Sequence, residues 1–250
     1  MKLSRAGKIT PLLLLVFFAF LATPLPVSAG SWRVHVLVAY DEEWQSIANR
    51  VYAYPPRELA SLLLYVVASR FWTFNIEFYP MGYVFWDSND NPTGPYAMLN
   101  EAMEEAGFES GMMLGGYVMH IFVAFTGQDI PLCYGLANST LGIVLVEHTY
   151  PSGVGQATDN VLQHELSHLY DADDESESGL DCVMNYYPQW IGFPYFKWVR
   201  TALITENWCA GCSATIMNHA DNWGYWDTGG GGGNGRIQFI AWGDERVNES

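Results

Sequence analysis

Residues 164–174, HELSHLYDADD, constrain the fold more than any other part of the sequence. His164 and His168 stand four residues apart, and on an α-helix this spacing stacks two side chains on one face, with Cβ atoms about 5–6 Å apart. Three leucines fall on another face and can pack against a sheet: Leu162, Leu166 and Leu169. The pattern predicts an amphipathic helix over 159–170, with Asp159 as its N-cap, that presents two imidazoles together.

Two imidazoles at this spacing can bind one zinc ion, and Glu165 stands beside them. A carboxylate at this place is suited to act as the general base for a zinc-activated water. The five-residue pattern HExxH also arises by chance on surface helices. Its place in an amphipathic helix, late in a chain that begins with an export signal, favours the functional interpretation. We therefore expect His164 and His168 as zinc ligands and Glu165 as the catalytic base.

The same stretch resembles the active-site motif of the metzincin zinc proteases, HExxHxxGxxH. Aligned on His164, it places Asp171 at the glycine and Asp174 at the last histidine. Aspartate enters the left-handed backbone region at tolerable cost, so we expect Asp171 to make the turn. A carboxylate is a good zinc ligand, and metzincins of the snapalysin type have aspartate at the last position. The resemblance implies that Asp174 is the third ligand. The alternatives are Asp173, His219 and Asp221.

A second segment, CVMNY at 182–186, resembles the methionine turn that metzincins pass beneath the metal, with Met184 as its floor. Met217, in ATIMN, is a weaker candidate for this turn. Tyr186 follows Met184 by two residues, where astacin-like metzincins have a tyrosine that reaches the metal region. The resemblance implies a catalytic role for its hydroxyl, as donor to an oxyanion. An ordinary packed tyrosine is an equal alternative.

The chain has four cysteines, Cys133, Cys182, Cys209 and Cys212. Cys-x-Met followed by Cys-x-x-Cys is similar to the archaemetzincins, in which these cysteines bind a structural zinc with one more cysteine directly after the third ligand. This chain has Glu175 at that position, so the fourth thiolate is missing unless Cys133 supplies it. In an oxidising compartment the four thiols can instead form two disulfides. We expect disulfides rather than a second zinc site.

The first 29 residues have the pattern of a secretory signal peptide: three basic residues, an apolar run and a small-residue cleavage site that ends at Ala29. An uncleaved anchor is the alternative. Residues 30–228 form the expected metalloprotease catalytic domain, and 229–250 a Gly-rich linker and C-terminal tail. We expect a secreted, extracellular protein without stable membrane insertion after cleavage.

The mature chain is strongly acidic. Removal of Lys2, Arg5 and Lys8 leaves 8 of the 11 basic residues against 27 acidic ones, a formal net charge of −19. Such a surface repels phosphate backbones, so nucleic-acid binding is excluded as the main function.

Apolar patterning predicts strands at 32–40, 74–86 with a kink near Pro80, 118–125, 132–137 at an edge, and 142–148. Helices are expected at 55–72, 96–107 and 159–170. This order indicates an α/β (α+β) fold: a metzincin-like mixed twisted sheet with helices against one face, including a buried helix and an active-site helix. A loop-rich C-terminal subdomain follows.

These expectations point to a secreted zinc-dependent endopeptidase. Its polypeptide substrate would add as a strand to the edge strand at 132–137. Two alternatives remain: a non-catalytic extracellular binding protein on the same fold, and a zinc amidase that acts on small substrates.

Overall fold

A computed structural model describes residues 30–227, except for 90–92, 131–132, 149–157, 192–196, 201 and 203. The expected signal segment and the expected tail at 229–250 lie outside the described residues. Among the described helices, none has the length and the apolar character needed to cross a membrane.

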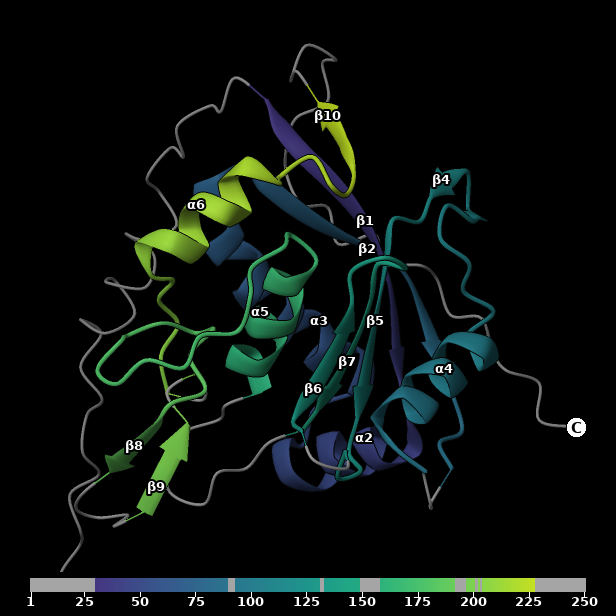
Figure 1. Cartoon of the computed structure of the whole chain (residues 1–250). Helices are drawn as coiled ribbons and strands as arrows, with labels where there is room; N and C mark the ends of the chain where they lie inside the picture. The colour runs from purple at the N-terminus through teal and green to yellow at the C-terminus, as the bar shows by residue number, and fades with distance from the viewer. Residues whose placement is uncertain are drawn as a thin grey trace, which may run out of the picture.

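The chain forms a mixed α/β fold around one six-stranded sheet (Figure 1). The strands of this sheet are β1 (Ser31–Tyr40), β2 (Ile76–Phe85), β5 (Ile121–Thr126), β6 (Gly135–Asn138), β7 (Ile143–Glu147) and β10 (Tyr225–Asp227). Two small two-stranded sheets pair β3 (Met113–Leu114) with β4 (Tyr117–Val118), and β8 (Pro188–Ile191) with β9 (Lys197–Arg200). The helices are α2 (Glu42–Ile47), α3 (Pro56–Phe71), α4 (Pro95–Glu105), α5 (Thr158–His168) and α6 (Ala210–Asn218), with a π-helical turn at Ala48–Tyr52 and a 3-10 turn at Trp72–Phe74.

The main sheet runs in the order β2-β1-β5-β7-β6. The first four of these strands are parallel, and β6 lies antiparallel to β7. The short strand β10 returns from the C-terminal part to pair antiparallel with the start of β1. The expected edge strand is confirmed, with its paired residues at Gly135–Asn138. Strand β6 is the last strand at one edge of the described sheet, and it lies next to α5.

Strand β2 has an irregularity where the sequence predicts a kink. Its pairing with β1 passes from Val36↔Pro80 to Leu37↔Gly82, so one residue of β2 is left over. Proline lacks the N–H that a regular ladder requires, and an extra residue at such a point bends the strand.

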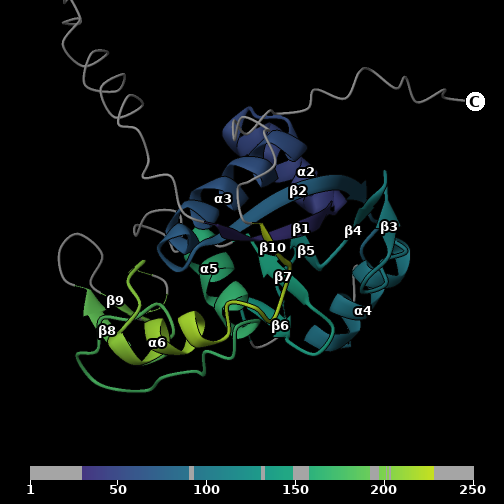
Figure 2. The ribbon, with the colours of Figure 1, turned by 90° about the horizontal axis from the view of Figure 1, so that it is seen from above.

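Alternating residues of the strands bury both faces of the sheet. In β1, Val34, Val36 and Val38 pack into one core cluster together with apolar residues of α3 and α5. Leu37 and Ala39 point into the second cluster, which contains Met98, Leu99 and Ala102 of α4. Figures 1 and 2 show α3 and α5 on one side of the sheet and α4 on the other. The expectation of helices against one face was therefore wrong, because parallel strands that are apolar on both faces need cover on both.

Helix α5 is attached to α3 by a partly buried polar contact. Arg70, near the end of α3, makes an ion pair with Asp159 at 2.5 Å and donates a hydrogen bond to Gln163 at 2.5 Å. The helix already includes Thr158, so Asp159 is not its N-cap as the sequence suggested. Its carboxylate instead fixes the orientation of the helix that carries the two histidines.

Candidate metal centre

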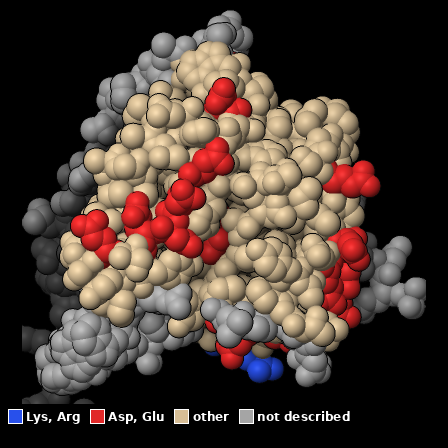
Figure 3. Space-filling view, in the orientation of Figure 1, with Lys and Arg blue, Asp and Glu red and all other residues tan. Residues whose placement is uncertain are grey.

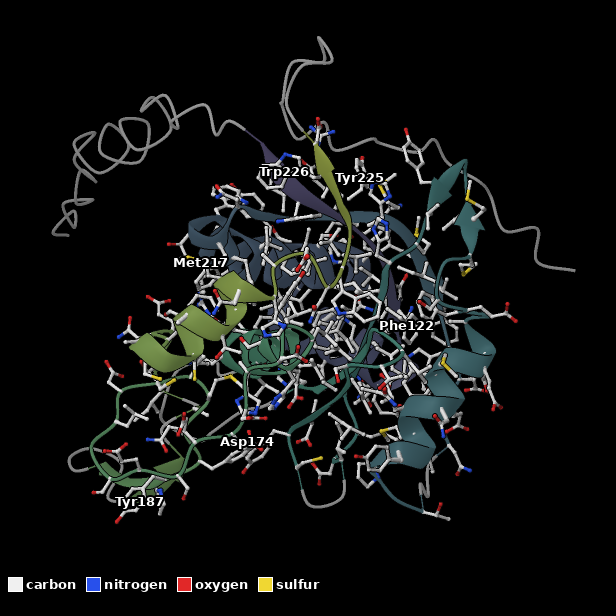
Figure 4. The ribbon with its side chains drawn as sticks, turned by 45° about the horizontal axis from the view of Figure 1, so that its top comes forward. Phe122, Asp174, Tyr187, Met217, Tyr225 and Trp226 are labelled. Atoms are coloured by element: carbon white, nitrogen blue, oxygen red, sulfur yellow. The ribbon has the colours of Figure 1, made fainter. Side chains whose placement is uncertain are left out.

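Three candidate ligands meet at the C-terminal end of α5. His164 Nε2 and His168 Nε2 are 3.1 Å apart. Asp174 Oδ1 lies 3.2 Å from His164 Nε2 and 3.4 Å from His168 Nε2. In Figure 4 Asp174 lies below α5, on the chain that follows the helix. The structure thus brings together the three residues that the sequence predicts as ligands, and they form one of two groups of candidate metal-binding side chains in its described part.

The spacing of these three atoms suits a zinc ion. Ligands at about 2.0–2.1 Å from zinc in a tetrahedral site are about 3.3 Å from one another. Both imidazoles are also oriented for binding. His164 Nδ1 donates to the carbonyl of Val183 at 2.9 Å, and His168 Nδ1 donates to the carbonyl of Ala172 at 2.7 Å. Because each Nδ1 is bound to a carbonyl, each Nε2 faces the other candidate ligands: it donates to Asp174 when the ring is protonated and offers a lone pair to a metal when the ring is neutral.

Electrostatics agree with this arrangement. Burial alone would raise the pKa of Asp174, but hydrogen bonds from His164 and His168 outweigh it and hold this pKa far below its ordinary range. For His168 burial lowers the pKa, while the hydrogen bond to Asp174 and the charge of Glu165 more than compensate and raise it. The carboxylate of Asp174 is therefore charged and available as a ligand at neutral pH.

The turn after α5 is made by Asp171, as the sequence predicts. Its φ is 61°, in the left-handed region, and its N–H donates to the carbonyl of His168 at 3.1 Å. Its carboxylate pairs with His219 at 2.9 Å. Of the alternative third ligands, neither His219 nor Asp221 belongs to the group of candidate ligands, and Asp173 is exposed outside it.

Glu165 lies inside the protein rather than in the group of ligands. Its exposed fraction is 3%. Burial raises the pKa of Glu165, an effect that the charges of His164 and His168 partly offset. Glu165 therefore binds a proton more readily than an exposed carboxylate does.

The structure has a turn at the segment that resembles the methionine turn. The N–H of Asn185 donates to the carbonyl of Cys182 at 3.0 Å, which closes a turn that contains Val183 and Met184. Met184 is fully buried in the main core cluster, and the carbonyl of Val183 binds His164. The competing candidate, Met217, lies on α6 and is 60% exposed (Figure 4), so it does not form such a floor.

Tyr186 lies next to the candidate ligands. Its ring meets the ring of His164 edge to face, with centroids 5.0 Å apart and an interplanar angle of 82°. This places the tyrosine beside the candidate ligands, as the sequence predicts, and the contact also orients the imidazole.

Three of the four cysteines form the second group of candidate metal-binding side chains. The Sγ atoms of Cys182 and Cys212 are 3.7 Å apart. The backbone N–H of Cys209 donates to Cys182 Sγ at 3.2 Å, and that of Cys212 donates to Cys209 Sγ at 3.4 Å. Hydrogen bonds, chiefly from Cys212, lower the pKa of Cys182 to about 6. A cysteine is suited to bind a metal when its sulfur atom accepts hydrogen bonds from backbone N–H groups and the pKa of its thiol is lowered.

Cys133 packs against the opposite core cluster, and no disulfide joins any two of the four cysteines. The two disulfides that we expected are therefore not found, because three of the cysteines converge on one point and the fourth lies elsewhere.

The segment after α5 is acidic and exposed. Its exposed carboxylates include Asp171, Asp173, Asp174, Glu177 and Asp181. Figure 3 shows Asp and Glu side chains in a band across this face, while the Lys or Arg side chains in view lie at the lower edge. The candidate metal centre thus opens on a negatively charged surface, which attracts cations.

Sequence reasoning missed the two carbonyls that orient the histidines, those of Ala172 and Val183. A backbone acceptor has no side-chain signature, so no pattern in the sequence could have identified either one.

No protein-family model and no curated protein matches this chain. Among solved structures, one described as a chaperone-substrate complex is similar at a TM-score of 0.44 and 10% sequence identity. The similarity covers 77% of this chain and 35% of that chain, so this chain spans about a third of its length. Similarity at this level indicates nothing about function.

Proposed function

We propose that this protein is a secreted, zinc-dependent endopeptidase of metzincin-like architecture. His164, His168 and Asp174 hold the zinc ion, and Glu165 is the general base. The observation that carries this proposal is the set of three ligand atoms at mutual distances of 3.1–3.4 Å beside a buried glutamate. Zinc bound there would polarise the scissile carbonyl and lower the pKa of water.

Glu165 has the position and the environment for the proton transfers of peptide hydrolysis. It takes a proton from the attacking water and passes it to the leaving amine. Its burial supports this role, since a carboxylate kept from solvent binds a proton more readily than an exposed one. Tyr186, beside His164, is available to donate a hydrogen bond to the oxygen of the carbonyl under attack.

The edge strand β6 provides a place for the substrate. An extended peptide that pairs with β6 would continue the main sheet by one strand, and its backbone would run past Glu165. Backbone pairing of this kind accepts many sequences, which suits an endopeptidase acting on polypeptides. The signal-like residues 1–29 support secretion, and an uncleaved anchor is the alternative.

Two other functions use the same fold. A non-catalytic extracellular binding protein has no need for a buried carboxylate beside the metal ligands, and burying such a group costs stability. A zinc amidase for small substrates would share the metal centre, but it would not need the edge of β6. The position of Glu165 favours an enzyme, and the edge strand favours a polypeptide substrate.

The mature protein is expected to hydrolyse casein, and the activity should disappear on removal of metal by a chelator and return on addition of zinc. A small amide substrate is assayed in parallel. Hydrolysis of the amide alone would indicate an amidase, and stable zinc binding without any hydrolysis would indicate a binding protein.

We also infer that Cys182, Cys209 and Cys212 hold a second, structural zinc ion, since their sulfur atoms lie within 4.8 Å of one another. Three thiolates satisfy most of a tetrahedral structural site. The purified protein is therefore expected to contain two zinc ions per chain by elemental analysis. Replacing Cys209 and Cys212 with serine should reduce this to one, while Cys133→Ser, the control, should leave two. One zinc ion in the wild type would refute the second site.

A further inference from the structure

Gly135, the first residue of β6, lies against the catalytic face of α5. It pairs with Val146 of the neighbouring strand. A Cβ atom at this position would lie 2.6 Å from Glu165 Oε1, 2.7 Å from Glu165 Cγ and 2.8 Å from Val161 Cγ1. All three distances are shorter than Cβ contacts in proteins, so even a methyl group has no room here.

The backbone does not explain the choice of glycine. Gly135 is not among the residues with positive φ, and it has a regular partner in the sheet. Glycine in such a position weakens a strand relative to alanine, and it commonly marks the close approach of another group. The group that approaches Gly135 is the side chain of Glu165.

The rest of the strand agrees with this interpretation. Leu136 packs against the core cluster on the other side of the sheet. Ala137 is the next residue that faces α5, and it packs against the same core cluster as the helix. The residues of β6 that face α5 are thus small, and the smallest of them stands where the helix presents Glu165.

We propose that Gly135 is a positioning residue for Glu165. The absence of a side chain lets the carboxylate lie directly against the edge strand, next to His164 and His168 and where a peptide added to β6 would pass. The contact also keeps Glu165 away from solvent, at 3% exposure. The catalytic consequence rests on the proposed function, whereas the steric relation between Gly135 and Glu165 does not.

A double-mutant cycle on thermal stability tests the steric relation without any assay of activity. It compares the zinc-saturated mature protein with Gly135→Ala, Glu165→Ala and the double variant. Gly135→Ala should lower Tm by about 3–6 °C, as overpacking does in a protein of this size. In the Glu165→Ala background, Gly135→Ala should lower Tm by less than half as much, because the two close contacts with the Glu165 side chain are gone.

An equal loss of Tm in the two backgrounds would overturn the proposal. If Gly135→Ala does not fold, the double variant decides: recovery of a folded protein supports the proposal, and failure to recover overturns it.

The catalytic consequence is measured with the zinc-loaded Gly135→Ala enzyme. Displacing the base while leaving the ligands in place should lower kcat at least about 10-fold, with zinc content and KM unchanged. Gly94→Ala is the matched control, since a Cβ at Gly94 meets nothing within 4 Å. Unchanged kcat in Gly135→Ala would overturn the positioning role. A wild-type protein without hydrolytic activity would instead refute the proposed function, and the stability cycle would still decide the steric relation.

Discussion

Replacing Glu165 with glutamine is expected to lower kcat for peptide hydrolysis by about 10²–10⁴-fold, the contribution typical of a positioned general base. Glutamine has nearly the same shape, so the packing of α5 against β6 should be retained. Zinc should also remain bound, because Glu165 is not among the three clustered ligands. The measurement is kcat and zinc content of the same purified sample.

The matched control for this variant is Asp173→Asn, which makes the same chemical change at an exposed carboxylate one residue before Asp174. It should keep both zinc and activity. Hydrolysis at the wild-type rate by Glu165→Gln would show that another group accepts the proton, and the mechanism proposed here would be wrong.

Much of the candidate metal centre was predictable because it depends on local geometry. Two histidines four residues apart on a helix must share a face. The resemblance to the metzincin motif put the turn at Asp171, where aspartate tolerates positive φ, and the structure places this residue at 61°. Once the helix and the turn are fixed, Asp174 has little freedom to lie elsewhere. The three residues 164, 168 and 174 are therefore a nearly local motif.

Elements that depend on distant partners were not predicted. Strand β10 has three residues, too few for a period-2 pattern, and it exists because it pairs with the start of β1. Helix α6 begins at Ala210 between two cysteines, and Cys209 caps it by accepting the N–H of Cys212. Neither the short apolar run of α6 nor its cysteine cap is a signal that sequence patterns recognise.

The cysteines illustrate the same limit. Four cysteines in an exported chain favour two disulfides on composition alone, because composition carries no information about how far apart the sulfur atoms lie in the fold. The fold separates Cys133, on the core cluster beneath α4, from the other three. An odd group of three cannot form pairs alone, and its sulfur atoms lie close enough for one metal ion to bind all three, as proposed above.

Asp174→Ala is expected to weaken zinc binding at the catalytic site by more than about 100-fold and to abolish hydrolysis with it. Loss of an outer-sphere partner already costs about 10–100-fold in metal affinity, and Asp174 is a direct ligand in this proposal. The two imidazoles that remain leave zinc with too few protein ligands. Zinc content after dialysis against a graded series of chelator concentrations measures the effect, and the zinc ion proposed at the cysteines would serve as an internal reference in the same sample.

Asp174→His separates loss of a ligand from damage to the loop. The Oδ1 atom of Asp174 lies 3.2 and 3.4 Å from the two Nε2 atoms, so an imidazole on the same backbone position can reach the same ion. This variant should recover zinc binding that Asp174→Ala loses, whereas a residue with only a structural role would not be replaced by histidine in this way. Asp173→Ala and Asp221→Ala, which change the alternative ligands, should keep full occupancy. If Asp174→Ala retains its zinc while Asp221→Ala loses it, the proposed set of ligands is wrong, and Asp221 is the third ligand in place of Asp174.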